Sequence, residues 1–289
     1  MKYKLSYSLF YILNLISKIL PNFAKDKLAK STSILWYKLH SNYRKRVLTN
    51  LNFIYPNKSE NEKKELAKGV FLNLTYNLGS FIDNFNTKKE KILQKVTFKN
   101  EDILLNALQQ NRPIIFVTGH YSNWEILPLA IAAKYTPLIG VGRPLDQDYL
   151  DKVLRKNREQ FGNKMINKHG AMRELVKAMK QKKVVGLLVD QNLDGIEVEF
   201  MGKKTIHTTS VAILAQKFNA IAIPCFIKRV GFEQYIATFY KPIEADKEEF
   251  IFNHTQKQAI ITQKVIEEDI SQWMWIHRRW KATYPDIYK

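Results

Sequence analysis

Short apolar runs that alternate with segments of helical length are the feature that most restricts how this chain can fold. From about residue 96 onward the strand candidates are residues 114–118, 138–141, 184–189 and 221–227. A helix is expected at residues 208–218, and residues 235–240 are expected to form an edge strand. Strands that alternate with helices build a mainly parallel sheet covered by helices. The sequence therefore predicts an α/β fold with a mainly parallel central sheet flanked by helices.

Polar or turn-forming residues follow three of the predicted strands directly. Gly119 and His120 follow the first strand, Arg143 lies just beyond the second, and Asp190 and Gln191 follow the third. In sheets of this kind, ligands bind outside the carboxyl ends of the strands. We therefore expect these side chains to share one site.

The loop after the first predicted strand holds both a base and a carboxylate. It reads Gly-His-Tyr-Ser-Asn-Trp-Glu over residues 119–125, and the apolar segment 126–134 after it is expected to be a helix. In one continuous helix His120 and Glu125 would be rotated by about 140° and could not share a face. If Asn123 or a neighbour caps the helix instead, Glu125 falls in the first turn and the two side chains can converge. A histidine oriented by a carboxylate is a general-base arrangement, which is our hypothesis for this pair.

The chain is strongly basic, with a formal net charge of +19 over 289 residues. Such a surface attracts phosphates, whether of nucleic acid, of lipid headgroups or of an acidic carrier protein, although a solvated basic surface fits the same charge. The single cysteine, Cys225, excludes an intramolecular disulfide framework and a cysteine-rich zinc site, so a protein that faces the cytosol is the default. The histidines show no metal-ligand spacing, and no metal site is expected.

The N-terminal segment 5–20 is mostly apolar but carries Asn14 and Lys18. It falls short of the roughly 20 uninterrupted apolar residues of a spanning helix. Three interpretations remain, namely an interfacial or marginal membrane anchor, a signal peptide and an ordinary core helix. We favour the anchor, because lysines on both sides of the segment would meet anionic lipid. On this hypothesis residues 1–23 form a membrane-associating helix.

Residues 24–289 are expected to form one domain, with a helical layer at 24–95 and the sheet and catalytic site at 96–289. Within the layer, one helix is expected to end at Tyr55-Pro56, and the residues from Ser59 to Glu62 open another through capping side chains. Near the C-terminus, Trp273, Trp275 and Trp280 are interleaved with His277 and two arginines. That segment suits stacking on nucleic acid and equally suits a membrane interface beside phosphates.

With these residues in view, the sequence resembles the lipid A biosynthesis acyltransferases, the lauroyl and myristoyl transferases of the wider lysophospholipid acyltransferase group. The motif of that family is a histidine, four residues and an acidic residue, present here as GHYSNWE against the family's GHFGNWE. The likeness covers nearly the whole chain and favours the membrane interpretation of the tryptophans. Its further matching runs, in the family's order, are Arg44 to Pro56, Arg143-Pro144, Arg158 with Phe161-Gly162, Val189-Asp190-Gln191, Phe200 to Lys203, Thr208 and the closing run from Gln272 to Lys281.

The resemblance implies an acyltransferase at the cytoplasmic face of the cell inner membrane. The implied donor is an acyl carrier protein thioester, and the implied acceptor is a hydroxyl of a Kdo-bearing lipid A precursor. Neither a cofactor nor a metal is expected, and nucleic acid is not an expected partner. In this hypothesis His120 is the general base, Glu125 fixes its tautomer, and Arg158 polarises the thioester carbonyl or grips a phosphate. The candidates for substrate binding are Asn123, Arg143, Asp190 and Gln191, of which the last two are expected chiefly to hold the shape of the site.

Two alternatives stay open from the sequence. The same chemistry could act on a glycerophospholipid or an aminolipid. A non-enzymatic basic protein that binds membrane or nucleic acid would share the charge, but its binding would survive the loss of His120 and would fall steeply with salt. Cys225 lies in an apolar run, where an inert buried thiol is expected rather than a nucleophile.

Overall fold

The computed structural model of the protein describes residues 2–192 and 194–289, with side chains from residue 8 onward. The helices are α1 (Lys2–Ile19), α2 (Asn22–Leu39), α3 (Ser41–Ile54), α4 (Glu60–Asp83), α5 (Lys89–Leu93), α6 (Glu101–Gln109), α7 (Ile126–Lys134), α8 (Asp148–Arg158), α9 (Ala171–Lys180), α10 (Ser210–Phe218) and α11 (Phe250–Glu268), with 3-10 turns η1 (Gln160–Gly162), η2 (Ile270–Gln272) and η3 (Pro285–Tyr288). The strands are β1 (Val96–Lys99), β2 (Ile114–Thr118), β3 (Ile139–Gly142), β4 (Lys164–Asn167), β5 (Val184–Leu188), β6 (Ile196–Phe200), β7 (Lys203–His207), β8 (Ile221–Gly231) and β9 (Gln234–Phe239).

In the described part of the chain, seven strands form one sheet in the order β1-β9-β8-β2-β5-β3-β4. Strands β2, β3, β4, β5 and β8 are parallel, whereas β9 pairs antiparallel with β8 and parallel with β1. The predicted α/β class with a mainly parallel sheet is confirmed. The prediction that β9 is an edge strand is wrong, because the short strand β1 pairs with its outer side. Strand β4 and the separate β6–β7 hairpin were not among the predicted strands.

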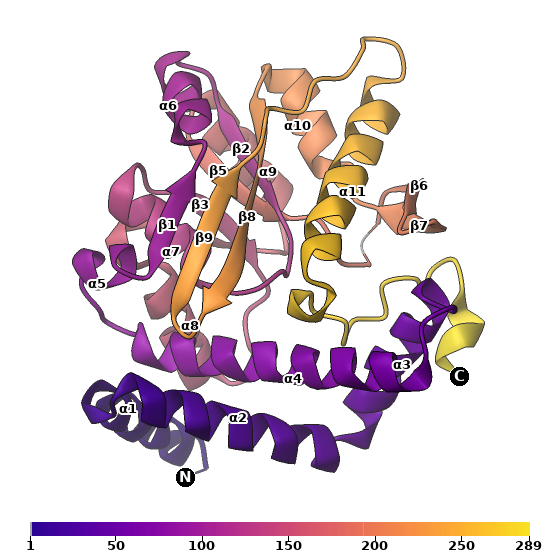
Figure 1. Cartoon of the computed structure of the whole chain (residues 1–289). Helices are drawn as coiled ribbons and strands as arrows, with labels where there is room; N and C mark the ends of the chain where they lie inside the picture. Colours follow the sequence, from indigo (N-terminus) through magenta and orange to yellow (C-terminus); the bar gives the residue numbers. More distant parts are fainter. Residues whose placement is uncertain (1, 193) are drawn as a thin grey trace.

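Strand β2 lies at the centre of the fold, since all five of its residues are buried. Ile114 and Phe116 pack with α6 and α7 on one face of the sheet, while Ile115 and Val117 pack with α9 and α10 on the other. This alternation follows from the two-residue period of a strand. Helices therefore cover both faces, and the free carboxyl edge of the parallel strands is where a site can form (Figure 1).

Helix α4 crosses that carboxyl edge and separates the sheet from α1 and α2 (Figure 1). It begins as the sequence predicts, because the Ser59 hydroxyl accepts from the Glu62 amide and the Glu62 side chain accepts from the Ser59 amide. From there it continues unbroken to Asp83. None of the helices in the described ranges is long and apolar enough to cross a membrane.

Candidate active site

The site is built first by the register of two neighbouring strands. Thr118 at the end of β2 pairs with Leu188 at the end of β5, so two residues further on His120 lies beside Asp190. The backbone amide of His120 donates to Asp190 Oδ2 at 2.6 Å, and His120 Nδ1 lies 2.8 Å from Asp190 Oδ1. Gly119 permits this approach, because a Cβ there would lie 2.9 Å from Asp190 Oδ2.

Asp190 is a buried, ionised carboxylate. Its side chain is 1% exposed, and Oδ2 also accepts from the indole nitrogen of Trp273 at 2.8 Å. Burial alone would raise the pKa of Asp190, but the charge and hydrogen bonds of His120 and the bond from Trp273 hold that pKa well below its usual range. Since an ionised carboxylate can only accept, Nδ1 of His120 carries a proton, and in the neutral imidazole Nε2 is the nitrogen with the lone pair. The imidazole is thus held as a base.

The predicted pairing of His120 with Glu125 is wrong as a contact in this structure. Glu125 is the last residue before α7 and accepts from Arg158, the last residue of α8, with Nε at 2.9 Å from Oε2 and Nη2 at 2.5 Å from Oε1. This is the bidentate geometry that arginine favours with carboxylates. Burial would lower the pKa of Arg158, but Glu125 outweighs it and raises that pKa. Glu125 therefore contacts Arg158, and Asp190 is the carboxylate in contact with His120.

Gln191 joins His120 to a second histidine that was not among the predicted site residues. Its Nε2 lies 2.8 Å from His120 Nε2 and 3.0 Å from His277 Nε2, and the two imidazole centroids are 5.6 Å apart. Burial and the neighbouring His120 lower the pKa of His277 to about 4. His277 is therefore neutral near pH 7. The only sequence signal for its role was its position in the closing run of the family.

The C-terminal segment forms one wall of the site. The Met274 amide donates to the His120 carbonyl at 3.0 Å, and the Ser122 amide donates to the Gln272 carbonyl at 2.8 Å. The expectation that the tryptophans of this segment face a membrane or nucleic acid is wrong, because they are buried and pack into the core beside Phe200. The three buried indoles are Trp273, Trp275 and Trp280.

Two predicted substrate-binding residues lie outside this contact cluster. Asn123 is not the N-cap of α7, which is Glu125, although its Oδ1 accepts from the Ile126 amide at 3.3 Å. Its 1% exposure argues against contact with a substrate. The side chain of Arg143 is 73% exposed, and its described ion pair is with Asp146 at 3.1 Å. Its role as a phosphate ligand stays a prediction.

Buried neutral histidines are expected to make stability depend on pH. Burial, with Arg279 as a further cause, lowers the pKa of His207 from 6.5 to about 3, and burial with Lys257 lowers that of His254 to about 4. The unfolded chain therefore binds more protons below pH 6.5, and stability falls as pH drops from 6.5 toward 4, by up to about 1.4 kcal/mol per pH unit for each histidine. Urea unfolding at a series of pH values measures the slope.

The control for this prediction is His254→Gln, in which one of the titrating groups is absent. The variant should show a shallower fall in the free energy of unfolding between pH 6.5 and 4. Asp83, whose pKa is about 2, loses its contribution only below about pH 4 and does not interfere. An unchanged slope in the variant would contradict the assignment.

Comparison with known proteins places these residues in a wider group. The sequence model of the family described as bacterial lipid A biosynthesis acyltransferase matches residues 2–282. Lipid A biosynthesis acyltransferase 2 of Shigella flexneri is 23% identical over 215 residues, which are 73% of this chain and 68% of that protein. The lipid A biosynthesis lauroyltransferase of Escherichia coli K12 is 23% identical over 246 residues, 82% of this chain and 79% of that protein.

Two further similarities complete the comparison. The lipid A biosynthesis palmitoleoyltransferase of Escherichia coli K12 is 22% identical over 242 residues, 81% of this chain and 77% of that protein. Among solved structures, a 1-acyl-sn-glycerophosphate acyltransferase from Thermotoga maritima gives a TM-score of 0.40 at 12% identity, over 86% of this chain and 97% of that chain.

Proposed function

The chain belongs to the bacterial lipid A biosynthesis acyltransferases and is an acyltransferase, and from this premise we propose its donor, acceptor and catalytic residues. The donor is an acyl carrier protein thioester, and the acceptor is a hydroxyl of a Kdo-bearing lipid A precursor at the cytoplasmic face of the inner membrane. The observation that carries the mechanism is the His120–Asp190 pair, in which the contact of Nδ1 with the carboxylate leaves Nε2 as the nitrogen that can act as the base.

In the proposed reaction His120 Nε2 removes the proton of the acceptor hydroxyl as its oxygen attacks the thioester carbonyl carbon. The tetrahedral intermediate then collapses, the carbon–sulfur bond breaks, and the thiolate takes the proton back from Nε2. The products are the new ester and the free thiol of the carrier, so His120 is regenerated. Asp190 stays ionised throughout and stabilises the imidazolium, as the carboxylate of a serine-protease triad does. No protein nucleophile is required.

Gln191 marks where the acceptor hydroxyl binds in this proposal. The amide nitrogen of Gln191 lies 2.8 Å from His120 Nε2, which is the distance expected for a hydroxyl oxygen in hydrogen-bond contact with the base. The substrate must therefore displace this bond. His277, neutral and on the other side of the same amide, keeps a hydrogen-bond partner for Gln191 while His120 is engaged.

Arg158 is proposed to supply the positive charge of the site. Its Nε and Nη2 are bonded to Glu125, which leaves the donors of Nη1 for a thioester carbonyl or a substrate phosphate. Glu125 then acts through Arg158 by fixing the plane of the guanidinium. This arrangement keeps both of the predicted residues in the reaction but assigns Glu125 a positioning role.

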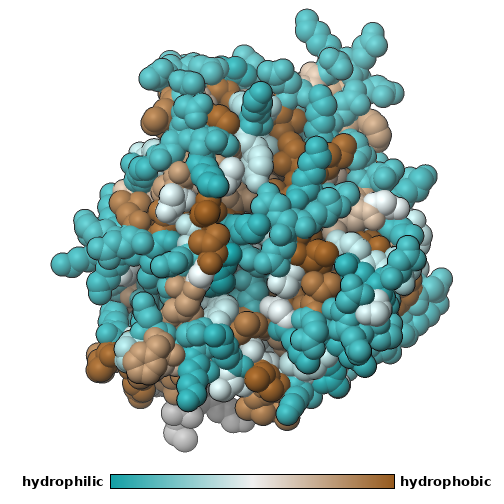
Figure 2. All heavy atoms as spheres, viewed as in Figure 1, coloured by the Kyte–Doolittle hydropathy of each residue, from teal (hydrophilic) through white to brown (hydrophobic). Residues whose placement is uncertain are grey.

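Membrane association is proposed to use one face of α1 and α2. Phe10 and Asn14 of α1 are buried against α4, and Asn14 Nδ2 donates to the Ile82 carbonyl at 2.5 Å. The opposite face is apolar and exposed. In Figure 2 some hydrophobic side chains are visible over α1 and α2 among hydrophilic ones. The exposed apolar residues of the two helices are Leu9, Ile12, Leu13, Leu15, Ile16, Ile19, Phe23, Leu28, Ile34, Leu35 and Leu39.

Lysines surround this apolar face and complete a surface suited to anionic lipid. Lys18 on α1 and Lys27, Lys30 and Lys38 on α2 are exposed. An amphipathic surface of this composition lies in the plane of a bilayer interface and binds through buried apolar area and attraction to anionic headgroups. The same basic character favours the acidic carrier protein, whose approach it would steer.

Replacing Ile12 and Ile16 together with glutamate should weaken binding to vesicles of anionic phospholipid at least about tenfold, because two apolar side chains that would enter the bilayer interface are lost and two negative charges are gained. Both residues are exposed, so the fold should be kept. Sedimentation with sucrose-loaded vesicles measures the bound fraction. The matched control replaces the exposed Ile213 and Ile260 of α10 and α11, and equal loss in both variants would contradict the assignment of this face.

To test the function, membranes that contain the protein are incubated with acyl carrier protein thioesters and a Kdo-bearing lipid A precursor. The mass of the lipid product is then measured by mass spectrometry. The expected result is a mass gain of one acyl chain. Parallel reactions with a glycerophospholipid acceptor and with coenzyme A thioesters test the acceptor and the donor separately. No mass gain with any donor, beside an active relative, would refute the proposed function.

A further inference from the structure

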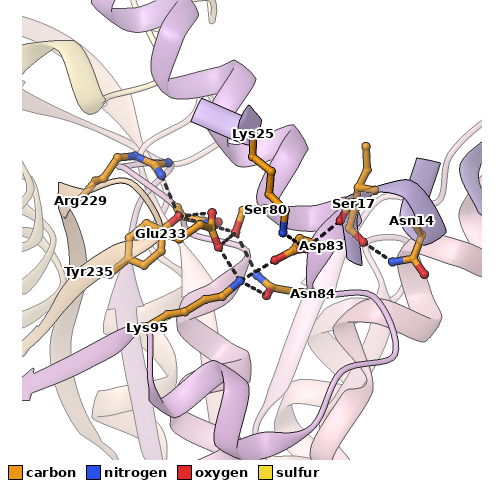
Figure 3. Close-up of polar contacts among 12 residues, drawn as sticks. Asn14, Ser17, Lys25, Ser80, Asp83, Asn84, Lys95, Arg229, Glu233 and Tyr235 are labelled. Atoms are coloured by element: carbon orange, nitrogen blue, oxygen red, sulfur yellow. Dashed lines mark hydrogen bonds and ion pairs between the residues drawn. The ribbon is translucent and has the colours of Figure 1, made fainter. Parts of the chain in front are cut away.

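A partly buried polar network lies between α4, the start of β1 and the β8–β9 hairpin (Figure 3). Lys95 is at its centre, with Nζ 3.0 Å from Asp83 Oδ2, 2.5 Å from Glu233 Oε2 and 2.7 Å from Asn84 Oδ1. Burial would lower the pKa of Lys95, but the two carboxylates outweigh it and raise that pKa. Buried ion pairs contribute little net stability. Stability alone therefore does not account for the network.

The backbone of Glu233 adds a second observation. This residue lies in the turn between β8 and β9 with a φ of 53°, and its side chain is only 8% exposed. Left-handed backbone at a hairpin turn favours glycine or asparagine and costs other residues about 1–2 kcal/mol. Departures from local turn chemistry concentrate where a side chain has a specific task. We therefore attribute the unfavourable backbone conformation of Glu233 to the contacts that its side chain makes with Lys95 and Tyr235.

From Glu233 the network reaches the loop that carries His120. The Tyr235 hydroxyl donates to Glu233 Oε1 at 3.2 Å and accepts from Asn123 Nδ2 at 3.0 Å and from Arg229 Nη1 at 2.7 Å. One donated and two accepted bonds use the full capacity of a hydroxyl. Asn123 is three residues after His120, and its Oδ1 accepts from the amide of Ile126, the first residue of α7, so its side chain links the loop to the start of the helix.

Arg229 fixes the loop through a second route. Its Nη2 donates to Asn77 Oδ1 at 2.6 Å, and the amide nitrogen of Asn77 donates to the carbonyl of Ser122. Ser122 itself has a φ of 52°, a conformation that needs support in a residue other than glycine. Two residues of the His120 loop, Ser122 and Asn123, are therefore held by hydrogen bonds from α4 and from the β8–β9 hairpin.

The other end of the network reaches α1 and α2, the two helices proposed to contact the membrane. Asp83 Oδ1 accepts from Ser17 Oγ of α1 at 2.7 Å and from Lys25 Nζ of α2 at 2.6 Å (Figure 3). A continuous set of contacts thus runs from α1 and α2 through Asp83, Lys95 and Glu233 to the His120 loop.

We propose that Lys95, Glu233 and Tyr235 are positioning residues, which hold the His120 loop in a fixed place relative to α1 and α2. This inference rests on the proposed acyl transfer, because a base that acts on a membrane-bound acceptor must be held at a set position above the lipid. A displacement of about 1 Å at a reacting group costs about 100-fold in rate. The network restrains such displacements without touching the substrate.

The test compares Tyr235→Phe and Glu233→Gln with the wild-type protein. Tyr235→Phe removes only the hydroxyl and leaves every charge in place, so it should fold even if Glu233→Gln does not. Hydrogen–deuterium exchange of the peptide 119–126 should become at least about tenfold faster, while exchange in β2 and β5 stays unchanged. Turnover should fall about 10-fold to 100-fold, with KM changed less than about twofold.

Glu101→Gln is the matched control, because Glu101 likewise accepts from a lysine and a tyrosine hydroxyl, those of Lys134 and Tyr135, at the α6–α7 side of the sheet. It should leave loop exchange and turnover unchanged. Unchanged loop exchange in both test variants overturns the proposal whatever the turnover, and so does faster exchange throughout the chain, which is global destabilisation. If the loop alone exchanges faster but the wild type transfers no acyl chain, the positional link stands and the proposed function fails.

Discussion

Replacement of His120 with alanine is expected to lower turnover by about 10²–10⁴-fold, the range that a positioned general base contributes. The substrate hydroxyl then has to be deprotonated by water. The side chain is 15% exposed, and Asp190 keeps two of its three donors, the His120 amide and the Trp273 indole. The expected cost in unfolding free energy is therefore only about 1–3 kcal/mol, from one lost bond to a buried carboxylate.

The measurement is acyl transfer by mass spectrometry at saturating donor, beside urea unfolding followed by circular dichroism. His254→Gln serves as the control, since it alters a buried histidine of α11 that lies outside the proposed site. The control should keep wild-type turnover. A His120→Ala variant that folds and retains more than a tenth of the turnover would show that His120 is not the base.

Asp190→Asn is expected to lower turnover by about 10³–10⁴-fold, the scale seen when the orienting carboxylate of a serine-protease triad is made an amide. The asparagine keeps the volume of the side chain but cannot stabilise the imidazolium, and its amide nitrogen can donate to Nδ1. The proton of His120 then moves to Nε2, the nitrogen that must act as the base. Loss of a deeply buried charge should leave the fold intact, because the amide oxygen can still accept from Trp273.

Glu125→Gln is the comparison that separates the two carboxylates. That change weakens a charge-assisted contact with Arg158 by about 1.5–3 kcal/mol, which corresponds to roughly 10–100-fold in rate or affinity. The structure therefore predicts that Asp190→Asn is more damaging than Glu125→Gln. If Glu125→Gln lowered turnover more than Asp190→Asn, the result would indicate that His120 pairs with Glu125 in the reacting complex.

Much of the fold could be predicted because its signals are local. Residues 114–118 were predicted as a buried strand and form β2 with those bounds, and the capping residues Ser59 and Glu62 begin α4 as expected. The strands that were missed or misplaced lack such signals. Strand β1 has four residues with alternate burial, and β9 resembles an edge strand although its outer neighbour is β1. Neither the residues of β1 nor those of β9 indicate by themselves that these two distant segments pair.

For the site, sequence patterns identified the strand ends but not the contacts between them. His120, Arg158, Asp190 and Gln191 were all singled out, and the structure brings His120, Asp190 and Gln191 together. His277 was assigned to an interface because tryptophans beside arginines suit a surface as well as a core. Their burial depends on how the C-terminal segment returns to the loop through the Met274 amide, a contact across more than half of the chain.

The sequence by itself determined that a base stands at the end of a buried strand, and through its whole-chain resemblance it indicated the family. Only the tertiary structure decided which carboxylate contacts His120. Glu125 is close to His120 in sequence, but its place before α7 directs it to Arg158. Asp190 is 70 residues away, and the parallel register of β2 and β5 places it beside His120, where Gly119 leaves room for its carboxylate.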